Sequence, residues 1–199
     1  SFLLIFHCSS AQTSTVAPND TCRKIDAYLT QLSREKNFSG GLLILKNGKR
    51  IFSKGYGWAN QETKTPFTPE TLASMGSITK AFTAAAILTL VEQGKLNLDD
   101  PLTKFFPSVP AEKSGITIHQ LLTHSAGFRE FLTGDTGDYE KIETDQYLAR
   151  AFKEPLAFVP GSKSIYTNVG YSLLGIIIEQ ISGQEYEQYL KMAVLKPMG

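Results

Sequence analysis

The chain has 199 residues, of which 42% are hydrophobic and 20% are charged, and its formal net charge is +1 at pH 7. This is the composition of an ordinary soluble globular protein, and the length suffices for one substantial domain or for part of a larger one. Because the charge is nearly neutral and no block of basic residues occurs, nucleic acid is not expected as the main partner.

The first eleven residues have the pattern of the end of a secretion signal. Residues 2–6 are apolar but too few to span a membrane, and small residues at Ser9 and Ala11 fit cleavage before Gln12. Since neither Met nor a basic segment precedes this run, the chain is predicted to be cut at its start. We therefore expect an exported protein, periplasmic or extracellular, in which 12–21 is a linker and no segment is transmembrane.

The two cysteines are not expected to pair. Cleavage after Ala11 would remove Cys8 and leave Cys22 alone, which excludes an internal disulfide. Lipid attachment at Cys8 is the less favoured alternative, because the bulky Phe6 and His7 precede it.

Residues 21–36 are predicted to form an amphipathic helix with an apolar face made by Ile25, Tyr28, Leu29 and Leu32. A β-hairpin follows, with strands at 41–45 and 50–54 joined by Asn47-Gly48, a strong signal for a two-residue turn. Two strands do not make a stable sheet by themselves. The sequence therefore predicts that further strands are missing and that it is a fragment of a longer protein.

The rest of the chain is predicted to be mainly helical. Between Thr71 and Asp100, apolar residues recur at three- and four-residue spacing, and Gly94 ends the run. The residues expected on that apolar face are Ile78, Phe82, Ala85, Ala86 and Leu90. A capping box of Thr117 and Gln120 heads a short helix over 118–124. Further helices are expected at 141–152, 169–181 and 185–195. Loops are expected at 106–115, 128–138 and 155–164, and the second of them is a candidate rim of a cleft.

Ser77 and Lys80 lie at the front edge of the first of these helices, three residues apart and therefore on one face. Free backbone N–H groups and the positive end of the helix dipole gather there and stabilise a developing anion. Burial at such a site favours a neutral lysine amine, which could accept the Ser77 proton and leave a nucleophilic oxygen. The Ser-x-x-Lys pattern is loose, because Ser33 and Lys36 also fit it. A helix cap with a lysine reaching to solvent is the competing interpretation.

Tyr166 and Asn168 form a second candidate group, at the end of a loop and just before an apolar helix. A tyrosine phenol can relay a proton when a lysine ammonium lowers its pKa, and an Asn amide can bind a substrate carbonyl. Taken alone, the pattern is more typical of an Asn that caps a helix beside a core tyrosine.

The two histidines after the leader, His119 and His124, are five residues apart and lack a nearby Glu pattern. They are predicted to be a surface and a capping residue rather than metal ligands, and no cofactor or metal is expected. A Gly-x-Ser-x-Gly elbow is absent from the sequence, which argues against a Ser-His-Asp hydrolase.

Several short motifs occur in one order along the chain. They are Phe38-Ser39-Gly40-Gly41, Gly55-Tyr56-Gly57, Ser74 to Lys80, Leu121 to Gly127, and Pro160-Gly161 through Tyr166-Thr167-Asn168 to Tyr171. Over about residues 23–199, this ordered set resembles the serine beta-lactamase-like family, which includes class C beta-lactamases, D-alanyl-D-alanine carboxypeptidases and related esterases. The resemblance implies an α/β fold of α+β type, with an antiparallel sheet flanked by helices. It places the domain at 22–199, incomplete at its C-terminus, with a helical region at about 65–165.

By the same resemblance, Ser77 is the acylated nucleophile, Lys80 its proton acceptor, and Tyr166 the residue that passes a proton to the leaving group. Asn168 would hold the carbonyl side of the substrate, and the Ser77 N–H would form half of the oxyanion hole. The Lys/His-x-Gly strand and the second oxyanion donor of the family would lie beyond Gly199, so these residues alone are expected to be weakly active or inactive.

These implications predict a serine hydrolase that acts through an acyl-enzyme on a beta-lactam, a D-Ala-D-Ala peptide or another amide, or an ester. A non-catalytic relative that binds cell-wall peptides or a partner protein is the alternative.

Overall fold

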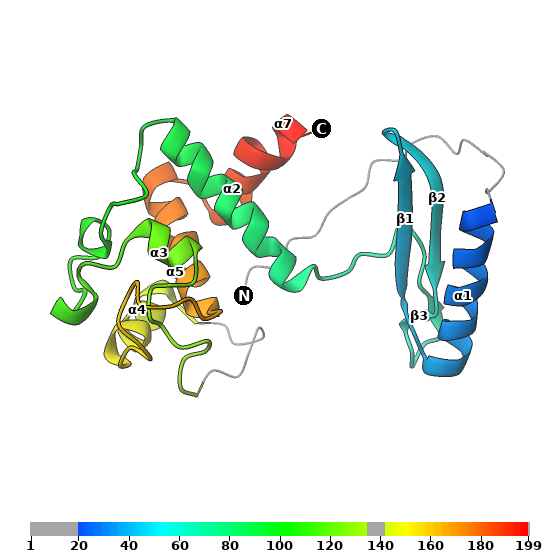
Figure 1. Cartoon of the computed structure of the whole chain (residues 1–199), viewed down its shortest axis with the longest axis horizontal. Coiled ribbons are helices and arrows are strands. Elements are labelled where there is room, and N and C mark those ends of the chain that lie inside the picture. Colours follow the sequence, from blue (N-terminus) through cyan, green and yellow to red (C-terminus); the bar gives the residue numbers. More distant parts are fainter. Residues whose placement is uncertain (1–19, 135–141, 199) are drawn as a thin grey trace. The chain divides into compact units, whose positions relative to one another are not determined.

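The structure is a computed structural model that describes residues 20–134 and 142–198 (Figure 1). The predicted secretion signal, with Cys8 in it, and nearly all of the 12–21 linker lie outside the described residues. The described chain divides into two compact units, one ending at Ser74 and the other beginning at Met75.

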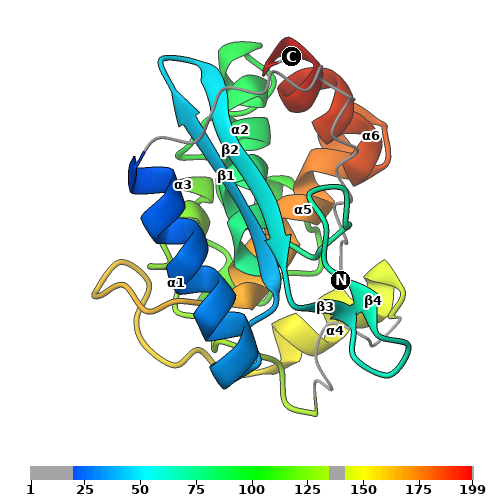
Figure 2. The same cartoon turned by 90° about the vertical axis from the view of Figure 1, so that its right-hand side faces the viewer.

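The first unit is a helix packed on a hairpin. Helix α1 (Asp20–Lys36) matches the helix predicted from the apolar spacing, and Cys22 on it is buried. Strands β1 (Gly40–Lys46) and β2 (Lys49–Tyr56) pair antiparallel. Their turn residues, Asn47 and Gly48, have φ of 52° and 72°, as a two-residue turn that follows the strand twist requires. Helix α1 contacts β2 and runs alongside the hairpin in Figure 1. Two shorter strands, β3 (Trp58–Asn60) and β4 (Thr65–Pro66), form a second ribbon (Figure 2).

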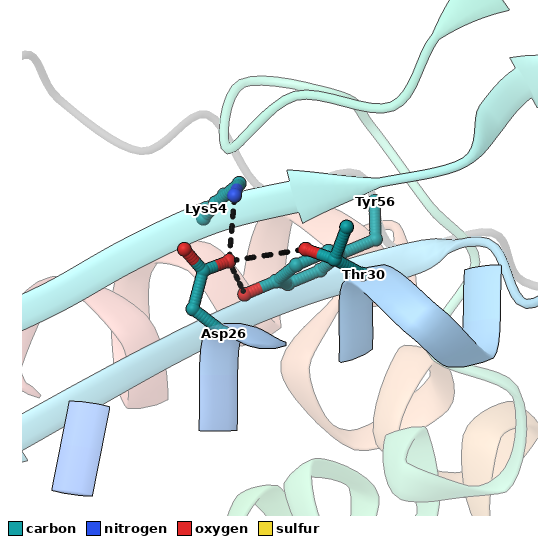
Figure 3. A network of polar contacts seen from close by, with 4 residues as sticks. All are labelled: Asp26, Thr30, Lys54 and Tyr56. Atoms are coloured by element: carbon teal, nitrogen blue, oxygen red, sulfur yellow. Dashed lines mark hydrogen bonds and ion pairs between the residues drawn. The ribbon is translucent and has the colours of Figure 1, made fainter. Parts of the chain in front are cut away.

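A polar network on Asp26 ties α1 to β2 (Figure 3). The Asp26 carboxylate accepts hydrogen bonds from Lys54 Nζ at 2.5 Å and from the Tyr56 phenol at 3.0 Å, with a longer contact to Thr30. Because Tyr56 is only 5% exposed, its phenol needs such a partner. The hydrogen bond from Lys54 lowers the pKa of Asp26 despite the opposing effect of burial, and burial followed by the Asp26 carboxylate raises the pKa of Tyr56.

Replacing Asp26→Asn should therefore destabilise the protein in a pH-dependent way. Since the pKa of Asp26 in the folded protein lies below its ordinary value of 3.8, its contribution is present at neutral pH and is lost as the pH falls through the folded value. The Lys54 and Asp26 side chains are 45% and 34% exposed. Solvent screening should thus limit the loss at pH 7 to about 1 kcal/mol or less.

The thermal unfolding midpoints of the Asp26→Asn variant and the parent should differ at neutral pH and converge as the pH falls through the folded-state pKa of Asp26. The matched control is Asp20→Asn, which removes an exposed carboxylate that pairs with Lys24 on the same helix and should change the midpoint little. A difference that stays constant across the pH range would contradict this role of the Asp26 charge.

The second unit is helical. Its helices are α2 (Thr79–Glu92), α3 (Ile118–Leu122), α4 (Thr144–Lys153), α5 (Asn168–Ser182), α6 (Tyr186–Leu190) and α7 (Lys196–Met198), with a π-helical turn at Lys191–Leu195. Short 3₁₀ turns occur at Gly76–Ile78, Leu102–Lys104 and Ala111–Lys113. Helix α5 is the centre of this unit: it contacts α2, α3, α4 and α6, and most of its residues are buried (Figure 1). None of the helices in 20–134 and 142–198 is long and apolar enough to cross a membrane.

Local sequence signals predict the ends of α2 and α3 but misplace Ile78. Gly94, just after α2, has φ of 68°. The capping box of α3 is formed, since the backbone amide of Gln120 donates to Thr117 Oγ1 at 3.2 Å. The assignment of Ile78 to the apolar face of the helix is wrong, because its side chain is 61% exposed. Ile78 lies in the 3₁₀ turn before α2, where the 3.6-residue period that places apolar side chains on one face does not apply.

Candidate active site

The N-terminal end of α2 carries the first two candidate residues. Ser77 lies in the 3₁₀ turn that leads into α2, and Lys80 is the second residue of the helix proper. Ser77 is exposed and Lys80 is half-buried. A serine hydroxyl that is open to solvent can be reached by a substrate, whereas the lysine above it is held among other side chains.

The start of α5 brings the other two candidates to the same place. The Tyr166 phenol donates to Ser77 Oγ at 2.6 Å, a short distance for an O–H···O bond. Lys80 Nζ lies 4.8 Å from the centroid of the Tyr166 ring and donates to Asn168 Oδ1 at 2.6 Å. The structure thus gathers all four residues, but Ser77 Oγ bonds to Tyr166 and the Lys80 ammonium to Asn168.

The Asn168 side chain bonds to Lys80 of the site and does not cap helix α5. Thr167 occupies the N-cap position of α5, and the cap makes no side-chain hydrogen bond, so the capping interpretation of Asn168 is wrong. Because an ammonium group has donors only, the bond to Lys80 requires Asn168 Oδ1 on that side. This orientation leaves the Nδ2 amide as a donor for another acceptor.

Charge at the site favours ionisation of the Tyr166 phenol. Burial acts to raise the pKa of Tyr166, but hydrogen bonding with Lys80 and Ser77 and the positive charge of Lys80 outweigh it, and the pKa is lowered. The side chain is 41% exposed, so the phenol stays accessible to a bound molecule. A tyrosine with a lowered pKa is suited to exchange protons with a neighbouring hydroxyl.

His124 also belongs to this site, although the sequence indicated only a capping role. Its ring centroid lies 4.8 Å from that of Tyr166 and 5.0 Å from that of Tyr171, and its Nδ1 accepts a hydrogen bond from the Thr167 amide at 3.2 Å. His119, by contrast, is exposed, as predicted. The signal that could have singled out His124 is its place in the segment 121–127, one of the ordered motifs.

The described residues do not include a cluster of metal-binding side chains. Among residues 20–134 and 142–198, no group of three or more His, Cys, Asp or Glu side chains could hold a metal ion.

Residues 25–199 match the family described as Beta-lactamase. The chain belongs to the beta-lactamase family.

Two curated relatives agree with this. Protein flp of Staphylococcus aureus (strain COL) is 34% identical over 186 residues, which are 90% of this chain and 37% of that protein. PbpX of Bacillus subtilis (strain 168) is 35% identical over 191 residues, 96% of this chain and 46% of that protein. The chain thus spans less than half the length of these relatives.

Solved structures establish the fold. The octameric penicillin-binding protein homologue from Pyrococcus abyssi superposes with a TM-score of 0.74 at 36% identity, over 90% of this chain and 43% of that one. D-amino acid amidase from Ochrobactrum anthropi gives 0.79 at 26% identity, over 89% and 49%. EstCE1, a hydrolase with promiscuous acyltransferase activity, gives 0.74 at 25% identity, over 89% and 51%. The beta-lactamase-like fold of helices with small antiparallel sheets, expected as an α+β fold, is therefore confirmed.

The loop that carries Tyr166 is fastened to residues 123–127. Backbone amides of Ala157, Gly161 and Ile165 donate to the carbonyls of Gly127, Ser125 and His124 at 2.8, 2.8 and 2.9 Å. Gly127 has φ of 87°, and a Cβ there would lie 2.4 Å from the Phe158 carbonyl oxygen. The close approach of these two segments therefore requires a residue without a side chain.

The variant Gly127→Ala should lose far more stability than Gly183→Ala. Gly183 at the end of α5 has φ of 67° but open space where a Cβ would stand, so only the left-handed backbone penalises alanine, by about 1–2 kcal/mol. At Gly127 the clash with backbone adds to that penalty, and we expect a loss of roughly 3 kcal/mol or more. Chemical denaturation of both variants measures the difference, and equal losses would show that the approach of the two segments is not tight.

Proposed function

We propose that the protein is a serine hydrolase in which Ser77 attacks the carbonyl carbon of an amide, a beta-lactam or an ester and becomes acylated. The observation that carries the proposal is the 2.6 Å hydrogen bond between Ser77 Oγ and the Tyr166 phenol, beside the Lys80 ammonium. An amidase and a hydrolase with acyltransferase activity among the similar structures support this reaction class.

Tyr166 is the group placed to accept the Ser77 proton. The phenol donates to Ser77 Oγ in the structure, and once the phenol is ionised the same contact reverses, with the serine hydroxyl donating to the phenolate. The transfer leaves Ser77 Oγ free to form a bond to the carbonyl carbon, while an electron pair of the C=O bond moves onto the carbonyl oxygen.

The remaining steps use the same groups. When the tetrahedral intermediate collapses, the C–N or C–O bond to the leaving group breaks and the Tyr166 phenol returns its proton to the departing atom. Water then attacks the acyl carbon while the Tyr166 phenolate takes its proton; the bond from that carbon to Ser77 Oγ breaks, and the phenol returns the proton to Ser77 Oγ as the acid product leaves. The Ser77 backbone N–H is the proposed donor to the carbonyl oxygen, and the Asn168 Nδ2 amide is the proposed donor to the substrate's carbonyl side.

Lys80 acts in this scheme through its neighbours. Its ammonium lies over the ring of Tyr166, where it stabilises a phenolate, and it fixes the orientation of the Asn168 amide. Direct transfer from Ser77 to Lys80, which the family resemblance implies, is replaced here by transfer to Tyr166 with Lys80 as the stabilising charge.

Covalent labelling tests the nucleophile. In the full natural polypeptide that contains these residues, a fluorophosphonate or a labelled penicillin should attach to Ser77, and Ser77→Ala should abolish the labelling. Ser33→Ala is the matched control, because Ser33 is the other serine with a lysine three positions later and should label as the parent does. Ligand binding without labelling, unchanged in Ser77→Ala, would instead identify a non-catalytic binding protein.

The variant Tyr166→Phe tests the proton transfer. Losing general acid–base catalysis typically lowers the rate by about 10²–10⁴-fold, and we expect acylation to slow within this range. Because the pKa of Tyr166 is lowered from 10.0, the parent rate should rise with pH with a midpoint below pH 10, and the variant should lack this rise. The exposed Tyr28→Phe on α1 is the control, and an unchanged rate profile in Tyr166→Phe would exclude the phenol as the acceptor.

A further inference from the structure

We propose that His124 is a positioning residue for Tyr166: it holds the chain on both sides of Tyr166 and packs its ring on the phenol. The inference rests on the proposed role of Tyr166 in acyl transfer. In this proposal His124, which lies 42 positions earlier in the chain, determines how accurately Tyr166 is positioned for that role.

Three contacts join His124 to three consecutive residues. The His124 carbonyl accepts from the Ile165 amide at 2.9 Å, and His124 Nδ1 accepts from the Thr167 amide at 3.2 Å. Between these two bonds, the imidazole and the Tyr166 ring pack with centroids 4.8 Å apart at an interplanar angle of 34°. The backbone is thus fixed before and after Tyr166 while the ring between is restricted to one side.

Loss of the hydrogen bond from the Thr167 amide to His124 Nδ1 would cost free energy. Thr167 is 1% exposed, so water does not reach its amide, and a buried N–H without an acceptor costs about 1–3 kcal/mol. The Thr167 hydroxyl is already used, since it donates to the Arg129 carbonyl at 2.6 Å. An acceptor at the position of His124 Nδ1 is therefore needed to hold the turn that places Tyr166.

The imidazole is neutral in this arrangement. Nδ1 accepts a hydrogen bond only when it carries no proton, so the proton of the neutral ring lies on Nε2. The titratable side chains that face the ring are Lys80 of α2, Tyr166, and Tyr171 of α5. Burial, and then the positive charge of Lys80, lower the pKa of His124 and outweigh an opposing effect of the hydrogen bond with the Thr167 backbone; the net direction agrees with a neutral ring.

The backbone of His124 suggests variants that separate the two functions. Its φ is 58°, a left-handed value that Asn tolerates better than most residues. His124→Asn keeps an acceptor near the position of Nδ1 and removes the ring. His124→Phe keeps a ring against Tyr166 and removes the acceptor.

Acylation kinetics in the full natural polypeptide provide the main test. Since a misplacement of about 1 Å can cost 10²-fold in rate, we expect His124→Phe to lower the maximal rate of Ser77 acylation by a fluorophosphonate by about 10²-fold, with half-saturation little changed. His124→Asn should recover roughly tenfold of that loss, because the Thr167 amide keeps an acceptor. The exposed His119→Asn serves as the control. A parent-like rate in His124→Phe, or equal rates in the two variants, overturns the proposal.

A measurement on the unmodified protein covers the case in which His124→Phe does not fold. The ¹⁵N shifts of the His124 ring should show Nδ1 unprotonated and Nε2 protonated at neutral pH, and a proton on Nδ1 overturns the proposal. This readout does not depend on turnover. If Ser77 fails to label in the parent, the proposed function is refuted, while the ring shifts still report whether His124 holds the Thr167 amide.

Discussion

The packing of α2 against α5 decides where the four site residues meet. Each helix brings two of them at or just before its N-terminal end, Ser77 and Lys80 on one side and Tyr166 and Asn168 on the other. Both helices bury apolar side chains in a common core, and a hydrogen bond of 2.6 Å between Thr83 and Tyr186 ties α2 to the helix that follows α5. Because tightly packed helices cannot slide without opening voids, the 2.6 Å contact of Tyr166 with Ser77 depends on this core.

The Lys80 ammonium interacts with three other residues of the site. The Lys80 ammonium orients the Asn168 amide through a hydrogen bond, lies over the ring of Tyr166, and disfavours a second positive charge on His124. A carboxylate in place of this lysine would reverse all of these effects at once. The consequence for the proposed mechanism is that substitutions of Lys80 change both substrate orientation and proton transfer, so the two roles cannot be separated at that residue.

The features predictable from sequence are those set by residues close together in the chain. Asn47-Gly48 defines its turn, the capping box of Thr117 fixes the start of α3, and the spacing of Ser77 and Lys80 places them on one turn. The pairing of Tyr166 with Ser77 joins residues 89 apart, and only the ordered motifs of the family indicated it.

His124 was missed because nothing in its own neighbourhood identifies its partners. Its ring contacts Tyr166 and its Nδ1 accepts from Thr167, which lies 43 positions later. The misplacement of Ile78 has a different origin, since a change from 3₁₀ to α-helical winding within a few residues leaves no trace in the pattern of apolar residues.

Because Cys22 on α1 is buried, the reactivity of its thiol reports local opening of the first unit. The residue is 1% exposed, so a thiol reagent in solution can modify it only during moments when the helix and its surroundings separate. The rate of alkylation of the Cys22 thiol would then measure how often that separation occurs, in a unit that does not contain Ser77.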